Sequence, residues 1–469
     1  MSKASIHSFD SGRPRSSTTI IDKYAIVPIS ACVFALIAAP LLGSLTSADP
    51  LLTAHEKLVT EHSIAPRIFW PAMAAISVVL AAQNRSRLTL APHMVCLLAY
   101  LAFAGASVLW AFSSESSFVR FIQQLMIITS IVLPAMVATR TADMMRGLFL
   151  VFAFASILNV FFVVGGSQRV AFYAGRGVVE IGYDGYFGGK NYLGECAALT
   201  ILLSLHEMVY PGLRRALGTI AVIIATVLVF FSDSKTALGL ALIAPLLAGL
   251  TLIASRKMRI SPAIILLSIP FCYALLSRVL PSFNMNHFSY MLYGDSTFTG
   301  RTIIWDFVES EIARRPLLGW GYQSFWLVPG SPSFFEAPGW VRIMPNAHNG
   351  YYDTTLEMGY VGYALLVIFI IATLHAIGRV ADRDPTRGWL VLSLALYVIM
   401  WNYLESLWMR GFEFLWVVFL IITAEAALYW QPFPLTKAVF GSRTPRLRSP
   451  GASRGVPRSS HLKAATAPK

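Results

Sequence analysis

A polar stretch between residues 300 and 362 combines basic side chains, tryptophans and a histidine. Such side chains can bind charged groups and transfer protons. It contains Arg301, the pair Arg314 and Arg315, Arg342 and His348. Arginine guanidinium groups are planar, permanently charged donors that suit phosphate oxygens. A histidine can accept or hold a proton near neutral pH. The stretch therefore predicts a site that binds an anionic substrate and moves a proton at one side chain.

The position of His348 and Asn349 indicates the start of a helix. They follow Pro345 and precede an apolar run that begins near Tyr360. The free amides and the dipole at a helix N-terminus favour a nearby anion. We therefore take His348 as a catalytic candidate and Asn349 as a binding one, with a purely structural cap as the alternative. Glu357 is predicted to anchor an arginine or, as a less favoured role, to act as a base. The alternative is an ion pair that only holds an arginine and the helix together.

Two lysines outside this stretch extend the predicted cationic surface. Lys235 ends a short polar turn, where it can supply a charge to a phosphate or simply extend toward the membrane surface. Lys190 follows two glycines, but the segment is not a nucleotide-binding loop, because position 184 is Asp and position 191 is Asn. We therefore exclude a nucleotide site. Lys190 remains a candidate for an outward cationic rim, with a plain loop as the alternative.

These residues divide into two predicted groups. Arg301 and His348 are the catalytic candidates, and no cofactor or metal site is predicted. The substrate-binding candidates share a charged or polar side chain outside the apolar runs: Lys190, Lys235, Arg314, Arg315, Arg342, Asn349 and Glu357.

The apolar composition of the chain indicates which elements hold these residues. The 469 residues are 56% hydrophobic and 13% charged, and the mean hydropathy is +0.62. The charges cluster between apolar runs of about 16 to 22 residues, which are long enough to span a bilayer core. We predict an all-α, polytopic membrane protein with about 12 transmembrane helices. The expected ranges are 25–45, 68–82, 92–112, 119–138, 147–164, 192–209, 216–231, 236–254, 260–280, 360–378, 388–404 and 412–430.

Basic residues in the short connections predict the orientation. Arg85, Arg140, Arg214 and Arg256 all fall on one side of the expected membrane. The positive-inside rule then places both termini in the cytoplasm. On this reading 1–23 is a cytoplasmic N-terminal segment, 24–430 is the transmembrane domain, and 431–469 is a basic, disordered cytoplasmic tail. Segments 165–191 and 281–349 face outward, the second as a large periplasmic loop.

Charge and cysteine usage exclude some other classes of function. The net charge of +13 does not indicate a nucleic-acid partner, because much of it lies in short loops and in the tail. There it can contact anionic membrane lipids. The four cysteines each fall inside a predicted span and form no C-x-x-C pair, so neither a disulfide nor a zinc site is predicted.

The order and spacing of the motifs resemble the O-antigen ligase/polysaccharide polymerase superfamily. Within it, the chain is most similar to the ExoQ-type exopolysaccharide polymerases. The segments that carry the resemblance are Phe187 to Gly194, Gly300-Arg301 with Trp305, Pro316 to Gly321, His348-Asn349 and Glu357 to Gly362.

This resemblance implies a metal-independent, inverting glycosyl transfer at the periplasmic face of a bacterial inner membrane. The implied donor is an undecaprenyl-diphosphate-linked oligosaccharide, held at its diphosphate by Arg301, while His348 activates the acceptor hydroxyl. Lys235 stands where the family often has arginine, which keeps the charge but loses the two-pronged geometry. A chain-length regulator and export proteins are further implied partners.

Two other functions share parts of this pattern. A ligase would use the same donor but move a finished glycan to lipid A-core or another acceptor. A transporter or flippase of lipid-linked sugars would need charged residues near the membrane midplane and a repeat that supports alternating access. The charges of this chain gather instead in outward segments, so a polymerase is the preferred prediction.

Overall fold

The computed structural model describes residues 20–46, 64–88, 90–138, 143–166, 168–173, 177–280 and 300–430. Most of the predicted segment 1–23, the predicted tail 431–469 and residues 281–299 of the predicted loop lie outside this part of the chain.

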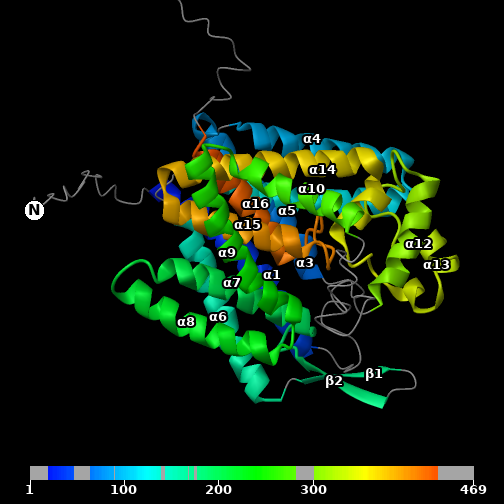
Figure 1. The fold of residues 1–469 in the computed structure, drawn as a ribbon, viewed down its shortest axis with the longest axis horizontal. Coiled ribbons are helices and arrows are strands. Elements are labelled where there is room, and N and C mark those ends of the chain that lie inside the picture. Colours follow the sequence, from blue (N-terminus) through cyan, green and yellow to red (C-terminus); the bar gives the residue numbers. More distant parts are fainter. Residues whose placement is uncertain are drawn as a thin grey trace, which may run out of the picture.

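The described chain is mainly helical (Figure 1). Every one of the predicted apolar segments falls on a helix. The elements are α1 (Ile20–Thr46), α3 (Ile64–Gln83), η1 (Arg85–Arg87), α4 (Pro92–Ala106), η2 (Ser107–Trp110), α5 (Ser114–Val137), α6 (Met144–Val164), α7 (Lys190–Glu207), α8 (Leu213–Phe231), α9 (Lys235–Met258), α10 (Pro262–Val279), α12 (Arg301–Arg314), α13 (Pro332–Phe335), η3 (Gly339–Ile343), α14 (Gly350–Arg383), α15 (Pro385–Trp401) and α16 (Phe414–Leu428).

Hydropathy and length identify a multi-pass membrane protein. In the described part of the chain, 7 helical segments are long and apolar enough to cross a membrane, and α1, α3, α15 and α16 add shorter apolar segments. The exact number of spans, and the side of the membrane that each loop faces, stay predictions.

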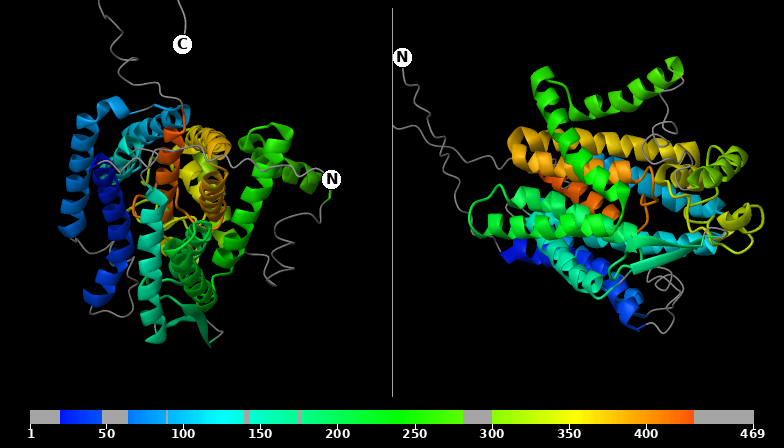
Figure 2. Two further views of the ribbon diagram at one scale, coloured as in Figure 1. Left: turned by 90° about the vertical axis from the view of Figure 1, so that its left-hand side faces the viewer. Right: turned by 60° about the horizontal axis from the view of Figure 1, so that its bottom comes forward.

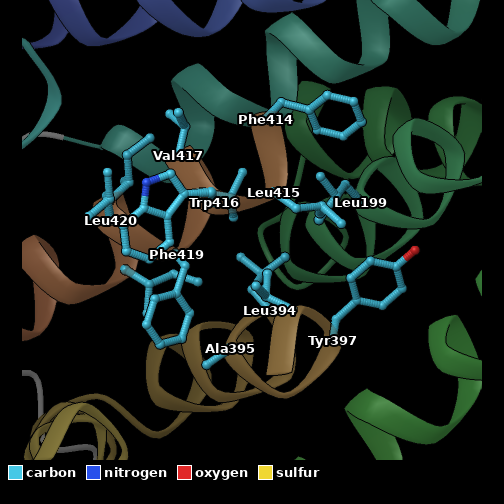
Figure 3. Close-up of a cluster of buried hydrophobic side chains, with 14 of the residues drawn as sticks. Leu199, Leu394, Ala395, Tyr397, Phe414, Leu415, Trp416, Val417, Phe419 and Leu420 are labelled. Atoms are coloured by element: carbon cyan, nitrogen blue, oxygen red, sulfur yellow. The ribbon is translucent and has the colours of Figure 1, made fainter. Parts of the chain in front are cut away.

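The two last helices form the centre of the bundle. α16 is buried along its whole length from Phe414 to Ala427, as expected of a helix that is apolar all round. Figure 3 shows Trp416 and Phe419 of α16 packed beside Leu394 of α15. α10 is the opposite case: it stands apart from the main bundle in Figure 2 and exposes large apolar side chains such as Phe271. This pattern fits a helix that faces lipid.

A β-hairpin departs from the predicted all-α fold. Strands β1 (Gln168–Tyr173) and β2 (Gly177–Tyr183) pair antiparallel, with Phe172 opposite Val178. Their Val, Phe and Tyr residues favour strands. The end of β2 packs on the α8–α9 turn, where a Cβ added to Gly182 would lie 2.6 Å from the Ser232 carbonyl oxygen. The hairpin lies at the same end of the bundle as α12 and α13 (Figure 1). We call this end of the bundle the site end, because the candidate functional site described below lies there.

A break in α14 near the site end is bridged by the loop before α13. Gly359 has φ 63° and ψ −173°, so the helical hydrogen bonds are interrupted there. The N–H of Trp320 donates to the carbonyl of Leu356 at 2.9 Å, and the N–H of Tyr360 donates to the carbonyl of Pro316 at 2.8 Å. The loop therefore supplies hydrogen-bond partners for backbone groups that the break would leave unsatisfied.

Two glycines allow the loop and the broken helix to approach this closely. A Cβ on Gly319 (φ +67°) would lie 2.5 Å from the carbonyl carbon of Glu357, and one on Gly359 would collide with the backbone of Leu317. Both motif glycines are thus explained by backbone geometry rather than by chemistry. The contact between residues 316–321 and residues 356–361 fixes the first turns of α14. We call it the loop–helix contact.

We expect Gly359→Ala to destabilise the protein by about 3 kcal/mol, because Ala is both strained at this φ and too large for the contact. Gly239→Ala in α9 is the matched control, since its added Cβ meets nothing within 4 Å, and Ala favours a helix. Thermal unfolding of both variants in detergent is the measurement. Equal melting temperatures for the Gly359 variant and the wild type would show that the loop–helix contact does not stabilise the protein.

Candidate functional site

One carboxylate joins three separate elements at the site end. Glu405 lies in the loop between α15 and α16, and its side chain is 16% exposed. One of its oxygens, Oε2, lies 2.8 Å from Nδ1 of His348. The other, Oε1, accepts from Nη2 of Arg301 at 2.8 Å and from the amide of Asn191 at 3.0 Å. The two predicted catalytic residues therefore meet at an acid that sequence analysis did not select.

Backbone contacts hold His348 in an unusual conformation. Its φ is +48°, in the left-handed region. Its N–H donates to the side chain of Asn346 at 2.9 Å. The preceding residue, Ala347, donates its N–H to Asp353 at 3.1 Å and accepts from the indole of Trp305 at 3.1 Å. Because both sides of this peptide are fixed, the imidazole is aimed at Glu405 before any substrate arrives.

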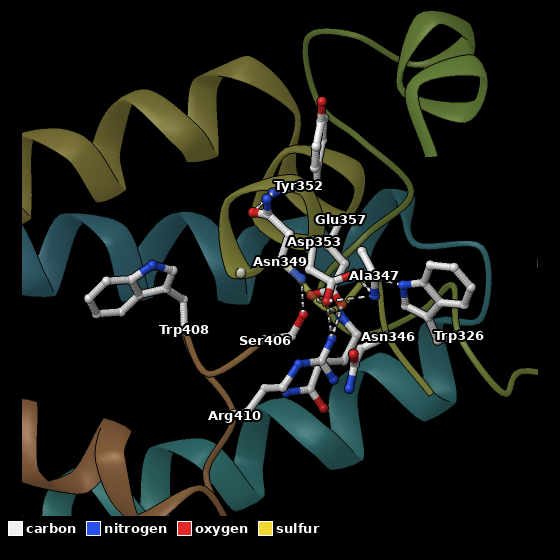
Figure 4. Close-up of polar contacts among 12 residues, drawn as sticks. Trp326, Asn346, Ala347, Asn349, Tyr352, Asp353, Glu357, Ser406, Trp408 and Arg410 are labelled. Carbon is white, nitrogen blue, oxygen red and sulfur yellow. Dashed lines mark hydrogen bonds and ion pairs between the residues drawn. The ribbon is translucent and has the colours of Figure 1, made fainter. Parts of the chain in front are cut away.

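A second ion cluster lies beside this loop (Figure 4). Arg410 lies 3.1 Å from Asp353 and 3.3 Å from Glu357, and Asp353 also accepts from the indole of Trp326 at 2.7 Å. Burial acts to lower the pKa of Arg410, but the two carboxylates outweigh it and raise the pKa above its ordinary value. Glu357 thus forms an ion pair with an arginine, Arg410, which fits both the predicted anchoring role and the purely structural alternative.

Four helix N-termini meet around Glu405. α12 and α14 reach it through Arg301 and His348, and α14 also donates the N–H of Gly350 to the Glu405 carbonyl at 3.0 Å. α7 reaches it through Asn191. α9 follows through its cap residue Ser234, whose hydroxyl donates to Asn191 at 3.1 Å. The side chain of Asn349 caps α14.

Each of these N-termini carries a basic residue. Lys190, Lys235 and Arg301 are the first residues of α7, α9 and α12, and His348 precedes the cap of α14. Cations at helix N-termini are unfavourable to the helices, because the dipole already makes that end positive. Four such ends in one place form a surface that an anion would stabilise. The arrangement suits a group with several phosphate oxygens.

The electrostatics of Glu405 reflect its partners. Burial acts to raise the pKa of its carboxyl, but the His348 imidazole and the Arg301 guanidinium together outweigh burial and lower the pKa below its ordinary value. The acid is therefore ionised throughout the neutral range. Its charge binds both basic side chains at one carboxylate.

The other predicted binding residues lie in separate contacts. Lys190 is close to the cluster and lies 3.5 Å from Asp233 in the α8–α9 turn. Arg314 pairs with Glu336 at 2.6 Å. Arg315 stacks over Trp320, with its guanidinium carbon 4.2 Å from the ring centre. The guanidinium of Arg342 donates to the carbonyl of Ala337 at 2.7 Å. The structure brings Arg301 and His348 together at Glu405, and Asn349 follows His348 in the chain. Lys190 and Lys235 are next in the chain to Asn191 and Ser234, which connect α7 and α9 to the cluster. The other three arginines hold the segment from α12 to η3 together.

Sequence analysis missed Glu405 and Asp353. The signal for Glu405 was an acidic residue in the short connection between two of the last apolar runs, since an acid beside the membrane is costly and usually functional. No comparable signal marked Asp353. Among the described residues, no group of three or more His, Cys, Asp or Glu side chains is arranged to hold a metal ion.

Two comparisons with known proteins match the chain. Residues 220–367 match the family model described as O-antigen ligase. The exopolysaccharide production protein ExoQ of Rhizobium meliloti (strain 1021) is 26% identical over 315 residues, which cover 62% of this chain and 67% of that protein. The family match runs from α8 into α14 and includes Lys235, Arg301, His348 and Asn349. It ends before Glu405.

We expect Glu405→Gln to lower the free energy of unfolding by about 2 kcal/mol, because it removes charge-assisted hydrogen bonds. Glu336→Gln removes an exposed acid that also pairs with an arginine. It is the control and should cost clearly less, because solvent weakens an exposed ion pair.

The difference in stability between the wild type and Glu405→Gln should depend on pH in a defined direction. Because the pKa of Glu405 is lowered in the folded protein, its stabilisation is complete above an unfolded-state pKa of about 4.3. It is lost as pH falls through the lower folded-state pKa. Melting temperatures of wild type and Glu405→Gln should therefore differ most near neutral pH and converge below about pH 4. A difference that stays constant down to pH 3 would contradict this role.

Proposed function

The chain is a member of the O-antigen ligase/polysaccharide polymerase superfamily, similar to ExoQ, and from this premise we propose that it is an exopolysaccharide polymerase. Membership supports a glycosyltransferase of the polymerase or ligase type. The finer proposal is that it joins oligosaccharide repeat units carried on undecaprenyl diphosphate. The observation that carries it is the meeting of four basic helix N-termini at the Glu405–His348–Arg301 cluster.

The donor diphosphate matches the charge of this surface. When the sugar leaves, negative charge grows on the departing diphosphate, and fixed cations and backbone amides that already face it lower the barrier. Arg301 and the N-termini of α7, α9 and α12 would bind the diphosphate oxygens. Lys235 contributes a point charge in place of a two-pronged guanidinium. The lipid diphosphate carries the driving force, so the scheme needs no nucleotide.

His348 would act as the general base. Its Nδ1 faces the Glu405 carboxylate, which favours the tautomer with a proton on Nδ1 and a lone pair on Nε2. Nε2 then takes the proton of the acceptor hydroxyl as that oxygen attacks the anomeric carbon. The new C–O bond forms opposite the breaking bond to the diphosphate, so the configuration inverts. The imidazole is 29% exposed, which leaves it accessible to an acceptor.

We place this site at the periplasmic face of the bacterial inner membrane, with both termini in the cytoplasm. The end of the bundle opposite the site supports this orientation, because basic residues such as Arg256 and Arg383 gather there. Membrane lipids would surround the bundle. A chain-length regulator and export proteins are proposed partners, since a polymer made at this face must be limited and exported.

A ligase is the second candidate, and the family match itself favours it, since that model is described as O-antigen ligase. Both enzymes would share donor, site and base, and only the acceptor differs. ExoQ is described as an exopolysaccharide production protein, which fits a role in exopolysaccharide synthesis. A flippase is a weaker candidate, because many of the ion pairs lie at the two ends of the bundle, at the site and around Arg387, Asp143 and Arg214.

The test is a reaction of purified protein with an undecaprenyl-diphosphate-linked repeat unit, without nucleotide, with the products sized on a gel. A polymerase gives a ladder of lengthening glycans. Transfer only after addition of lipid A-core would indicate the ligase. Movement of the lipid across vesicles without any lengthening would contradict both.

We expect His348→Ala to lower the rate of chain extension by about 100-fold or more, because a general base is lost. His375→Ala is the matched control: His375 lies in the same helix, α14, but bonds to Ser261 at the opposite end. That variant should extend chains like the wild type. Normal ladders from the His348 variant would remove this residue from the catalytic step.

A further inference from the structure

One tryptophan at the site end is half exposed beside the catalytic cluster. Trp340 of η3 is 44% exposed. A Cβ added to Gly300 would lie 3.5 Å from Cζ2 and 3.8 Å from Cη2 of its ring. Gly300 is the cap of α12, and the next residue is Arg301. The indole therefore borders the start of the helix from which Arg301 reaches Glu405.

Trp340 differs from the other tryptophans of this segment. Trp305, Trp320 and Trp326 are buried, and each donates its indole N–H to a protein oxygen. Within the described residues, the indole N–H of Trp340 donates to no such oxygen. The backbone that carries this ring is nevertheless anchored, because the next residue, Val341, is fully buried.

A tyrosine packs against a tryptophan of α12, the helix that begins with Arg301. Tyr403 is 42% exposed and lies two residues before Glu405 in the chain. Its ring lies edge-on to Trp305, with 6.1 Å between ring centres. Trp305 follows Arg301 by four residues on the same face of α12. Two half-exposed aromatic rings thus border the face of α12 that carries Arg301.

This chemistry suits a sugar ring. A pyranose presents an apolar C–H face and a polar edge, and an exposed aromatic ring with a polar tip complements both. In the proposed donor, the first sugar is bonded directly to the diphosphate. If Arg301 binds the diphosphate, that sugar must lie within reach of the two rings.

We propose that Trp340 and Tyr403 form a saccharide-binding subsite for the donor sugar next to the diphosphate. The subsite rests on the proposed function for the identity of its ligand. It separates recognition of the sugar, by the two rings, from recognition of the diphosphate, by the basic N-termini. Exposed tryptophans of membrane proteins often contact lipid headgroups instead of a ligand. The experiment below distinguishes sugar binding from such a lipid contact.

The experiment measures equilibrium binding, so it does not depend on turnover. The probes are the undecaprenyl-diphosphate-linked repeat unit, extracted from cells that lack this protein, and undecaprenyl diphosphate without sugar. The variants are Trp340→Ala, Trp340→Phe and Tyr403→Leu. Phe335→Ala in α13 is the matched control, since Phe335 is 65% exposed and its nearest ring is Phe334. Melting temperatures confirm that each variant is folded.

We expect Trp340→Ala and Tyr403→Leu to bind the sugar-bearing lipid roughly tenfold more weakly and the sugar-free lipid unchanged. Trp340→Phe should lose less, and Phe335→Ala nothing. Equal losses for both lipids would overturn the subsite and indicate a contact with lipid or phosphate, and so would a Trp340→Ala variant that binds like the wild type. The variants could lose affinity only for the sugar-bearing lipid while the wild type extends no chains. That result would contradict the polymerase proposal but support the subsite.

Discussion

The site depends on one partly buried carboxylate, Glu405, shared by two basic side chains. Glu405 gathers His348, Arg301 and Asn191 from elements that lie up to 214 residues apart in sequence. One of its oxygens faces the imidazole of His348, while the other accepts from the guanidinium of Arg301. A single charge thus fixes the positions of both basic side chains.

The residues around this carboxylate form two groups. One group fixes the backbone, and the other provides the basic side chains of the candidate site. Gly319 and Gly359 let the loop 316–321 bridge the break in α14, and Asp353 fixes the peptide before His348. These contacts hold His348 in its left-handed conformation. The motifs that carry the family resemblance therefore mix two roles. Their glycines are required by backbone geometry, whereas their basic residues Arg301 and His348 meet at Glu405.

Sequence reasoning reached the helices and the basic residues, because both depend on local patterns. Each predicted apolar run is helical, and Arg301 and His348 do lie together. The acid that joins them was missed, since a pairing across 57 and 104 residues leaves no periodic trace. The β-hairpin was missed as well, because a short pair of strands between apolar helices reads as loop. The ion pair of Glu357 with Arg410 was foreseen as a type of contact, but its partner was not.

The central claim is that the basic residues at these N-termini bind one diphosphate. The direct measurement is the affinity of undecaprenyl diphosphate for Lys190→Gln, Lys235→Gln and Arg301→Gln, with Arg256→Gln as the control at the opposite end of the bundle. The account predicts that each of the first three weakens binding by about tenfold or more, and that the control binds normally. Unchanged affinity in all three, or an equal loss in the control, would contradict it.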